Sequence, residues 1–99
     1  MALESKFKRD LVKDLHYLFP GSIVLKNDPN YLQGIPDLLI LFEDKWAALE
    51  TKKSKGSIRQ VNQEYYIDLL NRMSYASFIN PRNREQVLNE LQQTFQSHR

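Results

Sequence analysis

The sequence contains no cysteine and only three glycines, and its longest apolar run is Leu38–Phe42. A chain without cysteine forms neither disulfides nor cysteine-based zinc sites, so a reducing cytoplasm is the location we expect. A membrane helix needs about 20 consecutive apolar residues, and we therefore expect none. The charged N-terminal segment does not resemble a signal peptide. No Gly-rich phosphate loop and no nucleophile elbow occurs.

The composition is that of an ordinary globular domain. Apolar residues make up 41% and charged residues 26% of the 99 residues, so we expect one domain over residues 1–99. The net charge of +2 permits a polyanionic partner but argues for one only weakly.

Hydrophobic periodicity and turn residues predict the order of elements. The predicted helices and strands are a helix over 3–18, strands over 22–26, 36–42 and 45–52, a helix over about 58–73, a strand over 74–79 and a helix around 87–95. Three consecutive strands favour an antiparallel meander, and a crossover through the second helix would add a fourth strand. The expected fold is α/β, a mixed four-stranded sheet with helices on both faces.

The second predicted helix has two notable features. Ser57 is a candidate N-cap, and the inward stripe is expected to consist of Ile58, Val61, Tyr65, Leu69 and Met73.

The hairpin formed by the second and third predicted strands carries charge where a buried face is expected. A two-residue turn at 43–44 pairs Phe42 with Lys45, and counting outward places Asp37 opposite Glu50. Two facing carboxylates repel each other. The compensating charge could be Lys52, on the same face as Glu50, or a divalent metal ion, since hard cations prefer oxygen ligands.

Basic residues follow directly after these carboxylates. Lys52, Lys53, Lys55 and Arg59 form a run without an intervening acid. Metal ligands beside a basic strip suit a phosphodiester substrate, and a solvated charge run is the alternative for Lys53 and Lys55. Glu4 could reach the same metal, or it could be a first-turn acid that the helix dipole favours.

At these residues the sequence resembles the PD-(D/E)XK nuclease superfamily. Pro36-Asp37 corresponds to the "PD" and Glu50-Thr51-Lys52 to the "(D/E)XK". The expected α-β-β-β-α-β order, followed by a C-terminal helix, matches the restriction-endonuclease-like core of that superfamily. "GIPDL" from Gly34, "ETKKS" and a following helix with glutamines are most similar to the small VRR-NUC-type nucleases, including phage-encoded endonucleases. Archaeal Holliday-junction resolvases look more distantly similar.

The resemblance implies roles for the matching positions. Asp37 and Glu50, with the Thr51 carbonyl, would bind Mg²⁺, for which Mn²⁺ would substitute. Lys52 would orient the attacking water or stabilise the developing phosphate charge. Gln63 would be the site glutamine, with Gln60 as its competitor.

Two positions remain more loosely assigned by the resemblance. Glu4 matches the first-helix acid of many members by position only. Lys53, Lys55 and Arg59 would contact DNA.

The implied function is a metal-dependent DNA endonuclease, phage-encoded, acting in DNA replication, repair, recombination or homing in the host cytoplasm. A non-catalytic DNA-binding module on the same fold is the alternative, and a structural protein with an accidental motif is the third reading. We also expect a homodimer or a higher homo-oligomer, because one active site cuts one strand. Tyr65, Tyr66, Ile67 and Leu70 could supply its interface, unless the last helix covers them.

Overall fold

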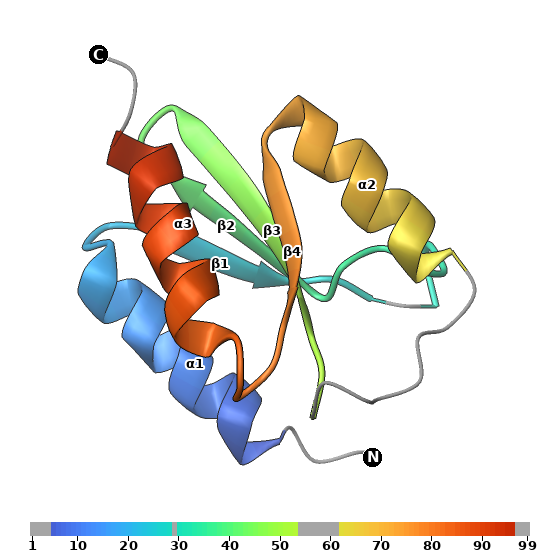
Figure 1. Cartoon of the computed structure of the whole chain (residues 1–99), viewed down its shortest axis with the longest axis horizontal. Helices are drawn as coiled ribbons and strands as arrows, with labels where there is room; N and C mark the ends of the chain where they lie inside the picture. The colour runs from blue at the N-terminus through green and yellow to red at the C-terminus, as the bar shows by residue number, and fades with distance from the viewer. Residues whose placement is uncertain (1–4, 29, 54–61, 97–99) are drawn as a thin grey trace.

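The computed structural model describes residues 5–28, 30–53 and 62–96. Its elements follow the predicted order α-β-β-β-α-β-α (Figure 1). They are α1 Lys6–Leu18, β1 Ile23–Lys26, β2 Leu38–Phe42, β3 Lys45–Thr51, α2 Gln63–Met73, β4 Tyr75–Ile79 and α3 Arg84–Gln96. The α/β class and the element order predicted from the sequence are therefore confirmed.

The four strands form one mixed sheet in the order β1-β2-β3-β4. The pairs β1–β2 and β2–β3 are antiparallel, whereas β3 and β4 are parallel, as expected for a chain that crosses over through α2. Phe42 pairs with Lys45 across the two-residue turn, and Glu43 takes a positive φ of 57° there, as hairpin turns of this length require. The predicted register is confirmed.

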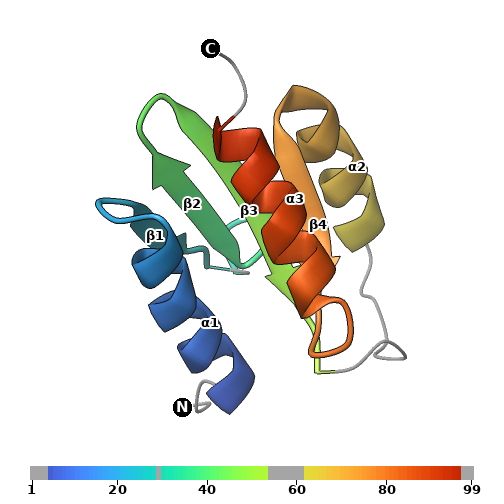
Figure 2. The same cartoon turned by 60° about the vertical axis from the view of Figure 1, so that its left-hand side comes forward.

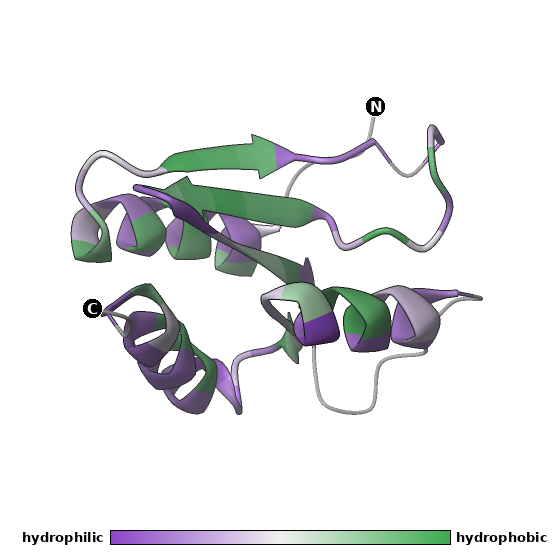
Figure 3. Ribbon diagram, turned by 90° about the horizontal axis from the view of Figure 1, so that it is seen from above, coloured by the Kyte–Doolittle hydropathy of each residue, from purple (hydrophilic) through white to green (hydrophobic). Residues whose placement is uncertain are grey.

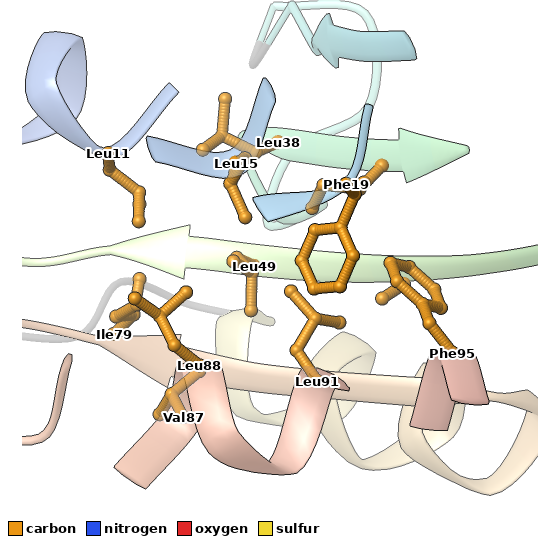
Figure 4. Close-up of a cluster of buried hydrophobic side chains, with 12 residues drawn as sticks. Leu11, Leu15, Phe19, Leu38, Leu49, Ile79, Val87, Leu88, Leu91 and Phe95 are labelled. Carbon is orange, nitrogen blue, oxygen red and sulfur yellow. The ribbon is translucent and has the colours of Figure 1, made fainter. Parts of the chain in front are cut away.

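The helices lie on both faces of the sheet, which confirms the layered arrangement. Figure 2 shows α1 and α3 on the near face and α2 behind it. The main core lies between the sheet and these two helices (Figure 4). Its fully buried members include Leu11, Leu15, Leu38, Leu49 and Leu91. A smaller cluster of Ala48, Ile67 and Ala76 lies under α2, and Figure 3 shows strands that are mostly apolar and helices that carry both apolar and polar residues.

The start of α2 corrects the predicted helix over 58–73. Asn62 has a φ of 73° in the left-handed region and stands at the N-cap position, so helical backbone does not run through it. Ser57, the predicted cap, lies outside the described residues. The loop before β2 approaches Asn62 closely, because a Cβ at Gly34 would lie 2.6 Å from the Asn62 Cβ. Only glycine permits this approach.

Of the stripe predicted for this helix, Ile58 and Val61 lie outside the described residues and Leu69 is half-buried, but Tyr65 and Met73 do not point inward. Tyr65 and Met73 are 60% and 66% exposed, whereas Ile67 is buried against the sheet and Leu70 packs beside it. The prediction counted helical turns from Ile58 through Asn62, and the break at Asn62 changes the phase.

These contacts also bear on the expected homodimer. Ile67 and Leu70 pack on the chain's own sheet, and α3 lies on the opposite face from α2, so it does not cover the aromatic residues of α2. The homodimer stays a prediction.

Among the described helices, none has the length and apolar character to cross a bilayer.

Candidate active site

The register of the hairpin brings Asp37 and Glu50 together at one end of the sheet. Asp37 directly precedes β2, and Glu50 lies one residue beyond the last β2–β3 pair, Leu38 with Leu49. The backbone N–H of Asp37 donates to Glu50 Oε1 over 3.1 Å. The two carboxylates that the sequence pattern places face to face therefore share one site.

Asp37 is held by Thr51 and by a lysine of α1. Its Oδ1 accepts from the Thr51 N–H over 3.0 Å, and its Oδ2 accepts from Thr51 Oγ1 over 2.7 Å. Lys8 Nζ lies 2.9 Å from the same Oδ2. Among the described residues, Lys8 is thus the cation paired with Asp37, and sequence reasoning missed it in favour of Lys52 or a metal ion.

Lys8 reaches the site because α1 begins beside this end of the sheet. Ser5 caps the helix, and its Oγ accepts from the Lys8 N–H over 3.1 Å. One signal in the sequence could have found it: Lys8 follows Glu4 by four residues, and residues four apart share one helix face. An expectation that Glu4 points toward the site therefore implies that Lys8 points toward it as well.

Glu50 is buried, and Gln63 connects it to Lys52. Lys52 Nζ donates to Gln63 Oε1 over 2.7 Å, and Gln63 Nε2 donates to Glu50 Oε2 over 3.1 Å. Because an ammonium group can only donate, Gln63 must turn its oxygen to Lys52 and its nitrogen to Glu50. Lys52 Nζ also lies 3.9 Å from Glu50 Oε2. The first residue of α2 thereby links the acid and the lysine of the motif.

Burial, and after it the nearby Asp37 charge, raise the pKa of Glu50 from its usual 4.5 to about 7. Lys52, the Asp37 N–H and Lys8 act in the opposite direction and do not outweigh burial. Glu50 therefore changes its charge near neutral pH, which is common at functional sites.

The other predicted site residues divide into two groups. Lys53 is described and exposed next to the site, and its contact with DNA stays a prediction. The Thr51 carbonyl as a metal ligand also stays a prediction. Glu4, Lys55, Arg59 and Gln60 lie outside the described residues, so of the two candidate glutamines only Gln63 is placed, and it is placed in the site.

A cavity of about 630 Å³ opens over these groups. Asp37, Glu50, Gln63 and Lys8 line one side, and the β1–β2 loop lines the other with polar residues such as Asn30 and Gln33. Asn27 fixes this loop, because its N–H donates to the Asp37 carbonyl over 2.9 Å. The site is thus accessible beside a polar loop, as expected for a substrate entrance.

The donor atoms of this site fit a hard divalent cation. Within the described ranges, no group of three or more His, Cys, Asp or Glu side chains could hold a metal ion. Mg²⁺, however, is usually bound by one or two carboxylates and completed by water and substrate phosphate oxygens. Asp37 and Glu50 meet that requirement once Glu50 is ionised.

The raised pKa of Glu50 predicts a stability that falls as pH rises. Between pH 4.5 and about 7 the folded protein keeps a proton on Glu50 that the unfolded chain has released, so raising the pH disfavours the folded state. Without metal, we expect unfolding free energy to fall by roughly 1–3 kcal/mol across this range, after allowance for solvent screening.

Urea unfolding of the wild type and of Glu50→Gln, each at both ends of this pH range and with a chelator, measures the effect. The variant should lose this component of the pH dependence. Glu85→Gln is the matched control, because Glu85 is an exposed carboxylate whose side chain is 84% accessible. An equal pH dependence in wild type and Glu50→Gln would contradict the prediction.

Comparison of the chain with models of protein families, with curated proteins and with solved structures finds no match. The resemblance to PD-(D/E)XK nucleases therefore rests on the motif residues and on the order of the elements around them. The site geometry is compatible with that resemblance, and the activity stays a prediction.

Proposed function

We propose that this chain is a metal-dependent DNA endonuclease that hydrolyses phosphodiester bonds. The observation that carries the proposal is the chain of hydrogen bonds from Lys52 through Gln63 to Glu50. Glu50 in turn lies opposite Asp37, and both carboxylates line one open cavity. Phosphodiester hydrolysis needs a positively charged hydrogen-bond donor, carboxylates that bind a metal ion, and a polar entrance for the substrate.

Asp37 and Glu50 hold the divalent cation in this proposal. When bound, the cation supplies Lewis-acid neutralisation of phosphate charge. Thr51 orients the Asp37 carboxylate through two hydrogen bonds, and Glu50 lines the same cavity. Lys8 occupies one side of Asp37 Oδ2 and is near enough to the cavity to contact a phosphate oxygen.

Lys52 acts on the substrate. Its ammonium group is held by Gln63 at 2.7 Å, so little further ordering is needed when charge develops on the phosphate or when the attacking water binds. A preorganised donor of this kind is worth more than a mobile one. Gln63 is a positioning residue, because it fixes Lys52 and Glu50 relative to each other.

A non-catalytic DNA-binding module on the same fold is the second candidate, and one contact favours it. The Lys8–Asp37 ion pair already compensates the charge that a metal ion would otherwise neutralise. In such a module the carboxylates would have a structural role, and DNA would bind through lysines without being cut.

Incubation of the purified protein with supercoiled plasmid separates the two candidates. We expect nicked plasmid with Mg²⁺ or Mn²⁺ and none with a chelator. Gel retardation of the same DNA without cleavage under any metal would support the binding module instead. A panel of duplex, single-stranded, flap and junction oligonucleotides then identifies which DNA structure is cut.

A further inference from the structure

A second cavity of about 420 Å³ lies next to the acidic one, on the other side of the β1–β2 loop. Its floor is the α2 face of the sheet, at Leu39, Trp46 and Ala48. Leu70 of α2 lines it as well, and Figure 1 shows the β1–β2 loop beside the first turn of α2. The phosphodiester chemistry proposed above uses none of these side chains.

The lining of this cavity is apolar and aromatic, with a polar rim. Tyr31 and Leu32 come from the loop, and Trp46 comes from β3. Tyr31 is 89% exposed at the edge of this cavity, so its ring is accessible to a ligand. Lys26, Asn27 and Asp28 supply polar atoms at the rim. Flat aromatic walls with a few polar groups are typical of sites that stack a planar ring.

The two cavities share a wall. Asn27 and Ile35 line both, while Pro36 lines the apolar cavity and the next residue, Asp37, lines the acidic one. Asn27 Nδ2 donates to the Pro36 carbonyl over 2.7 Å, which fixes this wall. The apolar cavity with Trp46 and Tyr31 is therefore adjacent to the acidic cavity in which the proposed phosphate would lie.

We propose that the apolar cavity binds an unpaired nucleobase of the nucleotide next to the scissile phosphate. The preferred substrate would then carry unpaired nucleotides at the cut. In a duplex both faces of a base are covered by its neighbours, whereas an unpaired base can stack on aromatic side chains. This inference rests on the proposed function, since it needs a phosphodiester in the acidic cavity.

The fluorescence of Trp46, the only tryptophan of the chain, reports directly on the cavity. The Lys52→Ala protein is titrated in Mg²⁺ with an oligothymidylate and with an abasic oligonucleotide of the same length and charge. We expect quenching and about tenfold tighter binding with the base-bearing strand only, because base–aromatic stacking contributes on this scale. Equal affinity and equal fluorescence for both strands would overturn the inference.

A loop variant and a matched control test the same point without disturbing the core. Tyr31→Ala should weaken binding of the oligothymidylate about tenfold and leave the abasic strand unchanged. Tyr17→Ala is the control, because Tyr17 is 83% exposed on α1 and lines neither of the two cavities. Equal weakening of both strands by Tyr31→Ala would show that the tyrosine does not contact a base.

Failure of this inference can be told apart from failure of the proposed function. Metal-dependent plasmid cleavage together with base-independent binding would overturn the base site alone. Absence of both cleavage and DNA binding would overturn the function and the base site together. A Trp46 signal that follows protein concentration without DNA, with a doubled mass in light scattering, would show that a second copy occupies the cavity.

Discussion

Lys52→Ala is expected to lower the rate of DNA cleavage by about 100-fold to 1,000-fold, the usual loss when one preorganised donor is removed from a transition state. Lys52 Nζ is held 2.7 Å from Gln63 Oε1 in the wild type, and alanine leaves no donor there. The fold should persist, because the Lys52 backbone N–H still donates to the Ile79 carbonyl over 2.8 Å. Single-turnover cleavage under saturating Mg²⁺ gives the rate.

Metal binding should survive this substitution, which separates loss of chemistry from loss of the site. Because Lys52 lowers the pKa of Glu50, its removal makes Glu50 harder to ionise. Calorimetric titration with Mn²⁺ is therefore carried out at several pH values above about 7, so that the protonation of Glu50 can be separated from the affinity of the ionised site. Under these conditions wild type and variant should have similar affinities.

Lys13→Ala is the matched control, because Lys13 is an exposed lysine of α1 and the change in charge is the same. Its cleavage rate should equal that of the wild type. If Lys52→Ala retained the wild-type rate within a few-fold, Lys52 would have no role in the reaction, and the non-catalytic reading would gain support.

Asp37→Asn is expected to abolish cleavage by a different route, because it weakens metal binding. We expect the metal affinity to fall by at least about 100-fold, which is more than the loss of affinity usually caused by substitutions outside the ligand shell. Asparagine keeps the shape and can still accept from the Thr51 N–H, which donates to Asp37 Oδ1 over 3.0 Å. It removes the negative charge that attracts a cation. Calorimetry with Mn²⁺ and plasmid nicking measure the two effects.

The same variant has a second readout that does not depend on metal. The Asp37 charge helps to raise the pKa of Glu50, so Asp37→Asn should lower that pKa and reduce the loss of stability between pH 4.5 and about 7. The variant also loses the ion pair with Lys8. A change in pH dependence, rather than in stability at one pH, therefore isolates the interaction between the two carboxylates.

Asp10→Asn is a close match for the control. Asp10 also pairs with a lysine of α1, since Lys6 Nζ lies 2.7 Å from its Oδ2, but it is exposed and remote from the cavity lining. It should bind metal and cut DNA as the wild type does. Unchanged metal affinity in Asp37→Asn would remove Asp37 from the proposed metal site.

The hairpin could be predicted from the sequence because the rules that govern it are local. Side chains alternate along a strand, and a two-residue turn sets the register of both strands. These two rules were enough to place Asp37 opposite Glu50, as the pairing of Phe42 with Lys45 and the contact between the two residues bear out. The element order followed in the same way from periodicity and turn residues.

The tertiary structure decided what depends on residues far apart in the sequence. Lys8 meets Asp37 only because α1 docks beside the end of the sheet, and α2 begins at Gln63 directly after the left-handed Asn62, which Gly34 of the β1–β2 loop approaches closely. The pKa of Glu50 is set by burial, which no single segment determines. Periodicity and turn geometry act over a few residues, whereas docking, burial and cavity shape are set by how the whole chain packs.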